Sequence, residues 1–185
     1  LHSGIDKHKD NCFIVTVNDE GKVLKEARVK NSVAALTAYF TSFGKEPHRA
    51  VVESTTGWYW LDDLLTSLGI ELILAHAKYL RAIAYVKVKT DPMDAHTLAH
   101  LLRLGYIPAA HKISRALRDT RDLCRARLRL VYKRTGCYNS IHRLGEKYNC
   151  DHLIDADKEV VPDSLPELVK EQILCQLAQI ALLNT

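Results

Sequence analysis

Four carboxylates stand at positions from which they could bind a divalent cation: Asp6, Glu53, Asp91 and Asp94. Asp6 lies just before the apolar run 12–17, and Glu53 ends the short apolar run 49–53. If the first strand is central in a sheet and neighbours the strand that ends in Glu53, both acids emerge close together. Each alone also has an ordinary interpretation, as a strand-end charge in solvent or as an acid beside the N-terminus of the next helix.

The other two acids lie at the start of a predicted helix. Asp91 is four residues before Ala95 and seven before Leu98, so helical spacing turns it towards the apolar face, and Asp94 is four before Leu98. Burying two carboxylates is costly unless cations or hydrogen-bond donors pair with them. Asp91 as an N-cap before Pro92 is the competing interpretation, and both stay open.

Clustered carboxylates repel one another, and a hard cation with oxygen ligands would neutralise them. Mg²⁺, or Mn²⁺ in its place, needs only a few protein carboxylates together with water and phosphate. Two such ions about 4 Å apart can activate an attacking oxygen and stabilise a leaving one in phosphodiester chemistry. The four acids therefore predict a nucleic-acid substrate.

The elements that must hold these acids follow from apolar spacing. We expect a β-hairpin at 12–17 and 23–29, helices at 33–43 and 61–68, strands at 49–53 and 70–74, and a further helix after Asp91-Pro92. This order predicts an α/β fold, with a mixed sheet and helices on its faces.

Size and composition limit the class of protein. With 185 residues, 47% hydrophobic and 26% charged, the chain can bury one core and a helical appendage. No apolar stretch approaches the roughly 20 residues that span a bilayer, so we expect no membrane protein. Five widely spaced cysteines fit neither a disulfide framework nor a paired zinc motif, and we expect a reducing cytoplasm.

A long helix is predicted from Ser114 to about Leu144. Its apolar pairs recur every seven residues, at 116–117, 123–124, 130–131 and 137–138. This repeat predicts a helical hairpin or a coiled coil and hence a homo-oligomer, although Arg127 and Arg134 occupy inner positions. A last apolar helix stops at Thr185 without a following partner, and we expect the chain to be the N-terminal part of something longer.

Charge is unevenly distributed along this second half. Residues 112–147 carry eleven Lys or Arg and three acids, a net +8, whereas residues 151–171 carry a net −5. A basic stripe can be a nucleic-acid footprint, and a solvated helix face explains it equally well. The candidate phosphate contacts are Lys87, Lys89, Arg118, Arg121, Arg125, Arg129 and Arg134.

Three motifs occur in order: Gly4-Ile5-Asp6 with Lys9-Asp10, then Glu53-Ser54-Thr55-Thr56-Gly57-Trp58-Tyr59-Trp60, then Lys87-Val88-Lys89-Thr90-Asp91-Pro92-Met93-Asp94-Ala95. Together they resemble the motifs of the DEDD transposases of bacterial insertion sequences, in the insertion-sequence one-ten class that also includes the Piv-type DNA invertases. The resemblance covers residues 4–144.

The resemblance implies a RuvC-like, ribonuclease-H-like catalytic domain at 1–110, a helical coiled-coil region at 111–185, and a separate C-terminal domain beyond the chain. It makes Asp6, Glu53, Asp91 and Asp94 catalytic ligands of Mg²⁺ or Mn²⁺, with DNA as the substrate and a bridge RNA as guide. The family's nucleophilic serine belongs to the C-terminal domain, so this chain would be incomplete for strand exchange.

Two other classes of function compete with this interpretation. A sugar-kinase or actin-like ATPase would need a glycine-rich turn after its first strand, where Lys7-His8-Lys9 stands. A non-catalytic module for nucleic-acid binding and dimerisation would leave the acids as helix caps. His96 and His100 have zinc-pair spacing but fall away from Asp91, and the aromatics 58–60 could stack on bases, although core packing suits them better.

Overall fold

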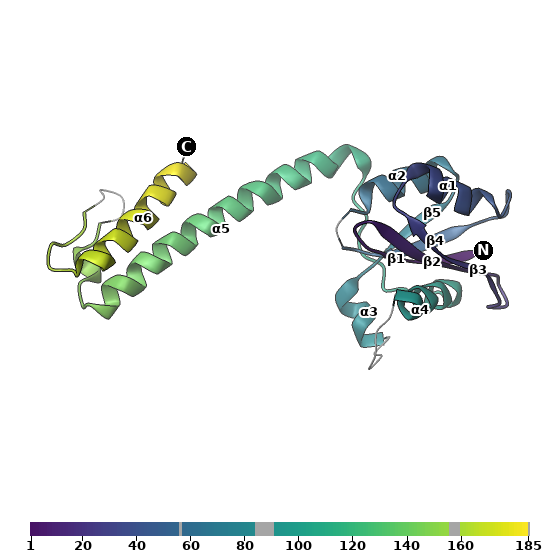
Figure 1. Ribbon diagram of the computed structural model, residues 1–185, viewed down its shortest axis with the longest axis horizontal. Coiled ribbons are helices and arrows are strands. Elements are labelled where there is room, and N and C mark those ends of the chain that lie inside the picture. Colours follow the sequence, from purple (N-terminus) through teal and green to yellow (C-terminus); the bar gives the residue numbers. More distant parts are fainter. Residues whose placement is uncertain (56, 84–90, 156–159, 185) are drawn as a thin grey trace. The chain divides into compact units, whose positions relative to one another are not determined.

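The computed structural model describes residues 1–55, 57–83, 91–155 and 160–184, with only the backbone for Arg81 and Leu153 (Figure 1). The contacts divide the chain into two units, a sheet unit, Leu1–Lys112, and a helical unit, Ile113–Thr185. Among the described helices, none is long and apolar enough to cross a membrane.

The sheet unit is built on one mixed five-stranded sheet. Its strands are β1 (His2–Lys7), β2 (Asn11–Val17), β3 (Val23–Lys30), β4 (Arg49–Glu53) and β5 (Glu71–Ala75), in the order β3-β2-β1-β4-β5. The pair β1 and β2 is antiparallel, as is β2 and β3, whereas β1 runs parallel to β4 and β4 parallel to β5. The mixed α/β architecture is confirmed, and the sheet is consistent with a ribonuclease-H-like fold.

The central strand β1 was not predicted from the sequence. We expected the sheet to begin at the run 12–17, with Asp6 before it, whereas Asp6 lies within β1 itself. His2, Ser3, Gly4 and Asp6 have little intrinsic strand preference. The strand forms because β2 and β4 hydrogen-bond to its two edges and because Ser3, Gly4 and Ile5 are buried.

Helices cover both faces of this sheet (Figure 1). They are α1 (Val33–Thr41), α2 (Tyr59–Ser67), α3 (Ala77–Ile83) and α4 (Asp91–Leu104). The Ser32 side chain caps α1 by accepting a 3.3 Å hydrogen bond from the Ala35 backbone N–H. Helix α3 was not predicted, whereas the expected helices at 33–43 and 61–68 and the one after Asp91-Pro92 are all present.

Helix α4 approaches β1 very closely, and Gly4 permits this. A Cβ at Gly4 would lie 2.1 Å from the Ala95 carbonyl oxygen and 2.4 Å from the Ala99 nitrogen, both backbone atoms of α4. Ala95 and Ala99 are fully buried against Val15 and Val17 of β2. Small residues on both elements therefore hold the helix against the centre of the sheet.

The opposite side of β1 carries a buried polar network. Ser3 Oγ lies 2.6 Å from Thr16 Oγ1 and 2.8 Å from His48 Nε2, and Thr16 Oγ1 lies 2.9 Å from the Tyr39 hydroxyl of α1. Burial, together with the nearby N-terminal ammonium and His2, lowers the pKa of His48 to about 4. His48 is therefore neutral at physiological pH and serves the core through hydrogen bonds.

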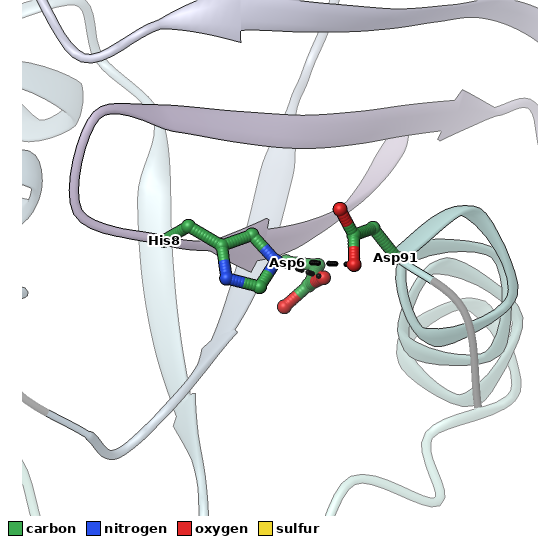
Figure 2. Close-up of side chains that lie close together, drawn as sticks. All are labelled: Asp6, His8 and Asp91. Atoms are coloured by element: carbon green, nitrogen blue, oxygen red, sulfur yellow. Dashed lines mark hydrogen bonds and ion pairs between the residues drawn. The ribbon is translucent and has the colours of Figure 1, made fainter.

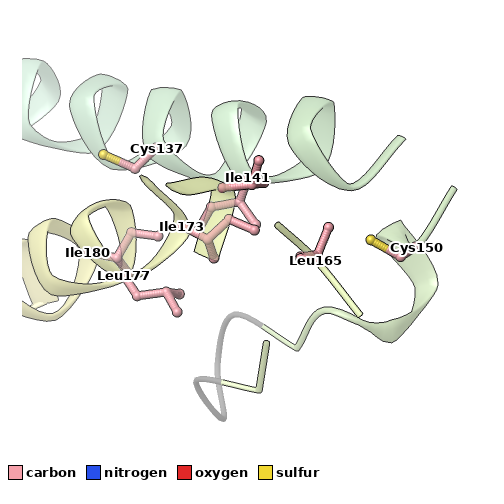
Figure 3. Packing of buried hydrophobic residues seen from close by; sticks show 8 residues of the cluster. Cys137, Ile141, Cys150, Leu165, Ile173, Leu177 and Ile180 are labelled. Atoms are coloured by element: carbon pink, nitrogen blue, oxygen red, sulfur yellow. The ribbon is translucent and has the colours of Figure 1, made fainter. Parts of the chain in front are cut away.

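The helical unit contains the long helix α5 (Arg118–Lys147) and α6 (Glu167–Asn184), with short 3-10 turns η1 (Arg115–Leu117) and η2 (Asp151–Leu153). The two helices are antiparallel. Arg134, near the middle of α5, donates a 2.8 Å hydrogen bond to Asn184 at the end of α6, whereas the C-terminal end of α5 packs against Leu165, just before α6 begins. Figure 3 shows this core, which includes Cys137, Ile141, Cys150, Leu165, Ile173, Leu177 and Ile180.

The seven-residue repeat finds no partner along the first half of α5 within the described chain. Leu123 is 72% exposed and Leu130 is 48% exposed, and the buried apolar residues of α5 begin at Cys137. The prediction of a hairpin describes the second half of the helix, whereas the predicted coiled coil stays a prediction.

Candidate metal centre

Two of the four acids come from neighbouring parallel strands. Gly4 of β1 pairs with Val51 of β4, and side chains alternate between the faces of a strand. Gly4 faces α4, and Val51 packs with Leu98 and Leu102 of the same helix. Asp6 and Glu53, each two residues further on, therefore project from the carboxyl ends of β1 and β4 on the face that α4 covers.

Helix α4 brings the other two acids to this face. Its first residue is Asp91, and its buried stripe begins with Ala95 and Leu98. Asp91 and Asp94 are both half-buried, as expected for side chains at the edge of that stripe. Because Gly4 holds the helix on β1, the N-terminal turn of α4 lies beside Asp6.

A histidine joins two of these carboxylates (Figure 2). His8 Nε2 lies 3.0 Å from Asp6 Oδ2 and 3.3 Å from Asp91 Oδ1. Each of the three residues offers one ligand atom, and these three atoms lie within 4.8 Å of one another, close enough to bind a single metal ion. Glu53 and Asp94 lie outside this grouping. His8 was not among the predicted ligands, although its position two residues after Asp6 could have drawn attention to it.

Arg28 of β3 fixes the remaining oxygen of Asp91. Its Nη2 donates a 2.9 Å hydrogen bond to Asp91 Oδ2, while its Nη1 donates a 3.0 Å hydrogen bond to Asn11 Oδ1 on β2. The guanidinium thus spans two strands and the helix, and it leaves Asp91 Oδ1 turned towards Asp6 and His8. Sequence reasoning missed Arg28, because only the antiparallel pairing of β2 with β3 brings it near the site.

The pKa values show how the negative charges interact. Burial raises the pKa of Asp6 above its usual value; His8 opposes this rise, while the charges of Asp91 and Asp94 add to it. For Asp91, burial alone would raise the pKa, but His8 and Arg28 together bring it below the usual value. Asp94 is therefore close enough to Asp6 to affect its ionisation.

The donor set fits a divalent cation. In an octahedral site with bonds of about 2.1 Å, adjacent ligand atoms lie roughly 3 Å apart. The separations of His8 Nε2 from the two carboxylate oxygens, 3.0 and 3.3 Å, have this size. The donor atoms of Asp6, His8 and Asp91 therefore have spacings that the ligands of one ion could adopt.

The predicted nucleic-acid contacts are distributed differently. Lys87 and Lys89 lie outside the described residues. On α5, Arg125 and Arg129 are exposed, Arg121 and Arg134 are half-buried, and Arg118 is buried, with 5% of its surface exposed. Arg118 is thus the least accessible of the five arginines to a phosphate.

The weaker candidates have structural roles. Trp58 is 6% exposed at the start of α2 and packs edge-on against Tyr59, as core aromatics do. His96 is not a free surface histidine, because its Nε2 lies 2.8 Å from Glu26 Oε2 of β3. His96 and His100 are both half-buried rather than exposed.

Comparison with known protein families identifies the chain. A family model for DEDD transposases of the IS110 type, described as "Transposase", matches residues 3–149. The matched range contains all four carboxylates, His8 and Arg28. No curated protein matches the chain.

Proposed function

The chain belongs to the DEDD transposases of IS110 type, and on that premise we propose that Asp6, Glu53, Asp91 and Asp94 bind Mg²⁺ or Mn²⁺ for the cleavage of DNA phosphodiesters in transposition. The convergence of Asp6 from β1 and Asp91 from α4 is the observation that carries the proposal. We extend the family's RuvC-like assignment to residues 1–110.

The four carboxylates have different roles in the proposed metal site. Asp6 and Asp91 would hold the ion from a central strand and from a helix, so the site depends on the packing of α4 against β1. Arg28 orients Asp91 through its 2.9 Å ion pair, and Glu53 and Asp94 supply further oxygens from the same face. The bound metal would polarise the scissile phosphate and activate the attacking oxygen.

The helical unit would supply contacts to the nucleic acid. Arg125 and Arg129 are exposed on α5 and can meet phosphates, with Arg121 and Arg134 beside them. Lys87 and Lys89 precede Asp91 in the sequence and are candidates for the same role. The guide RNA that the family resemblance implies would be bound by the same kind of contact, in a reducing cytoplasm that leaves the cysteines unpaired.

Calorimetric titration with Mn²⁺ and with Mg²⁺ tests the metal site. We expect the chain to bind both ions and an Asp6→Asn, Asp91→Asn double variant to bind neither, because both central ligands lose their charge. Glu71→Gln is the matched control: Glu71 is an exposed acid of β5 paired with Arg49, and its loss leaves the site intact. Circular dichroism must show that each variant folds. Equal binding by the chain and the double variant would contradict the proposal.

The second candidate function is a non-catalytic module for nucleic-acid binding and dimerisation. The observation that favours it is the exposure of Leu123, Leu128 and Leu130 on a basic helix, where a second α5 could cover them in a coiled coil. Light scattering with the chain and with a Leu123→Gln, Leu130→Gln variant tests it. A monomer at all concentrations would exclude the dimer. DNA binding that needs no metal, by a chain that takes up no metal in the calorimetric titration, would favour the binding module over the nuclease.

A further inference from the structure

The turn that carries His8 is held in place by its backbone. The His8 backbone N–H donates a 3.0 Å hydrogen bond to the Asn11 carbonyl across the turn between β1 and β2. The Asn31 side-chain amide donates hydrogen bonds of 2.8 Å to the His8 carbonyl and 2.9 Å to the Lys9 carbonyl. The backbone of His8 is therefore fixed where β1 turns into β2, and its exposed ring starts from a defined position beside the carboxylates.

Its imidazole lies beside the two central carboxylates, with Nε2 facing an oxygen of each (Figure 2). Nε2 lies 3.0 Å from Asp6 Oδ2 and 3.3 Å from Asp91 Oδ1, whereas the other oxygen of Asp91 is already bound by Arg28. These separations suit a hydrogen bond, and they also suit neighbouring ligands around one octahedral ion. Only small shifts of the side chains would be needed to exchange a proton for a metal.

We infer that His8 is a metal ligand, and that with Asp6 and Asp91 it forms a mixed nitrogen and oxygen site that favours a transition ion such as Mn²⁺ over Mg²⁺. This inference rests on the proposed metal site and adds a ligand and a metal preference to it. The chemical reason is that Mg²⁺ is bound almost entirely by oxygen, whereas Mn²⁺, which also prefers oxygen, accepts an imidazole nitrogen beside two carboxylates more readily than Mg²⁺ does.

The alternative role for His8 is that of a counter-ion, whose protonated ring neutralises the two carboxylates until a metal displaces it. The two roles predict opposite effects of removing the ring. Loss of a ligand weakens metal binding, whereas loss of a competing cation strengthens it. A single substitution therefore distinguishes them.

The experiment measures Mn²⁺ and Mg²⁺ affinity by calorimetry for the chain, for His8→Ala and for His96→Ala. We expect His8→Ala to weaken Mn²⁺ binding about tenfold or more and Mg²⁺ binding by a smaller factor. His96→Ala is the matched control, since His96 also pairs with a carboxylate of the sheet unit but lies outside the metal grouping, and it should leave both affinities unchanged. Unchanged or tighter Mn²⁺ binding by His8→Ala, or an equal loss for the two ions, overturns the inference.

A spectroscopic measurement on the unaltered chain guards against a variant that fails to fold. Electron spin echo spectra of bound Mn²⁺ should show modulation from a directly coordinated nitrogen, and that modulation should change when the chain carries nitrogen-15 histidine. Absence of nitrogen modulation overturns the inference, even if the Asp6→Asn, Asp91→Asn variant loses the metal and so upholds the carboxylate site. Absence of any metal binding by the chain overturns both.

Discussion

The sheet unit and the helical unit differ in how their functional side chains are held. In the sheet unit, Asp6 extends from a strand paired on both edges and packed against α4, with Ile5 and Val52 at most 1% exposed beside it. In the helical unit, Arg125 and Arg129 stand on a stretch of α5 where Leu123 is 72% exposed. The carboxylates are thus positioned by tertiary packing, whereas these arginines are positioned by the helix backbone. We expect substitutions around the carboxylates to affect stability, and substitutions of these exposed arginines to affect binding.

The largest effect is expected in the core of the helical unit. Ile173 is fully buried between α5 and α6, and Ile173→Ala should lower the free energy of unfolding by roughly 4 kcal/mol, since it leaves a cavity. Urea unfolding followed by far-ultraviolet circular dichroism measures this. Leu123→Ala on the exposed stretch of the same unit should change it by less than about 0.5 kcal/mol. Similar losses for the two variants would mean that Leu123 is covered by a partner.

The next effect concerns the contact that positions the metal site. Gly4→Ala forces a Cβ against the α4 backbone, and overpacking of this kind costs about 3 kcal/mol. It should also weaken Mn²⁺ binding, because Asp91 moves away from Asp6. Tryptophan fluorescence follows this unfolding, since Trp58 and Trp60 both lie in the sheet unit.

Gly44→Ala is the control for Gly4→Ala. Gly44 has φ +73° and open space around its Cβ position, so the substitution should cost about 1 kcal/mol of backbone strain and leave metal affinity unchanged. If Gly4→Ala retained full Mn²⁺ affinity, the close approach of α4 would not be what brings the carboxylates together.

A third, smaller effect is a pH dependence that belongs to the sheet unit. The folded-state pKa of His48 is lowered to about 4, so the unfolded chain takes up a proton first as the pH falls below the ordinary histidine value. The contribution of His48 to stability is complete above about pH 6.5 and declines towards pH 4. Between pH 7 and pH 5 the loss should be roughly 2 kcal/mol. Urea unfolding of the chain and of His48→Gln across this range measures it, and parallel pH profiles for the two would exclude His48 as the cause.

The smallest effect on stability, with a clear effect on binding, is expected on α5. An Arg125→Gln, Arg129→Gln variant should unfold within about 0.5 kcal/mol of the parent chain. Its DNA affinity should fall, and the slope of log affinity against log salt should decrease by roughly 2, because two phosphate contacts are lost. Arg49→Gln is the control, an exposed arginine of the sheet unit in an ion pair. An unchanged salt slope would remove these arginines from the proposed nucleic-acid surface.

The difference between the two regions also explains what could be predicted from the sequence. Strong apolar periodicity predicted the helices that become α1, α2, α4 and α5, and apolar runs predicted β2, β4 and β5. Strand β1 was missed, because Ser3, Gly4 and Asp6 become a strand only through their neighbours in the sheet. The order of the strands, and with it the position of Asp6 and Glu53 on neighbouring parallel strands, could only be assumed.

The candidate site shows the same limit. Helical spacing predicted that Asp91 and Asp94 face the apolar side of α4, where both are half-buried. Arg28 could not be predicted, and for His8 the sequence offered only its position two residues after Asp6, because the contacts of both residues join a turn and an edge strand to the start of a helix far along the chain. The spacing of residues along the sequence does not indicate contacts between residues so far apart.

The most direct test of the central claim is a crystal structure of the chain grown with Mn²⁺, with anomalous scattering used to locate the metal. We predict an anomalous peak between the carboxylates of Asp6 and Asp91, within bonding distance of an oxygen of each. Well-ordered carboxylates without a peak, or a peak at another place on the chain, would contradict the account.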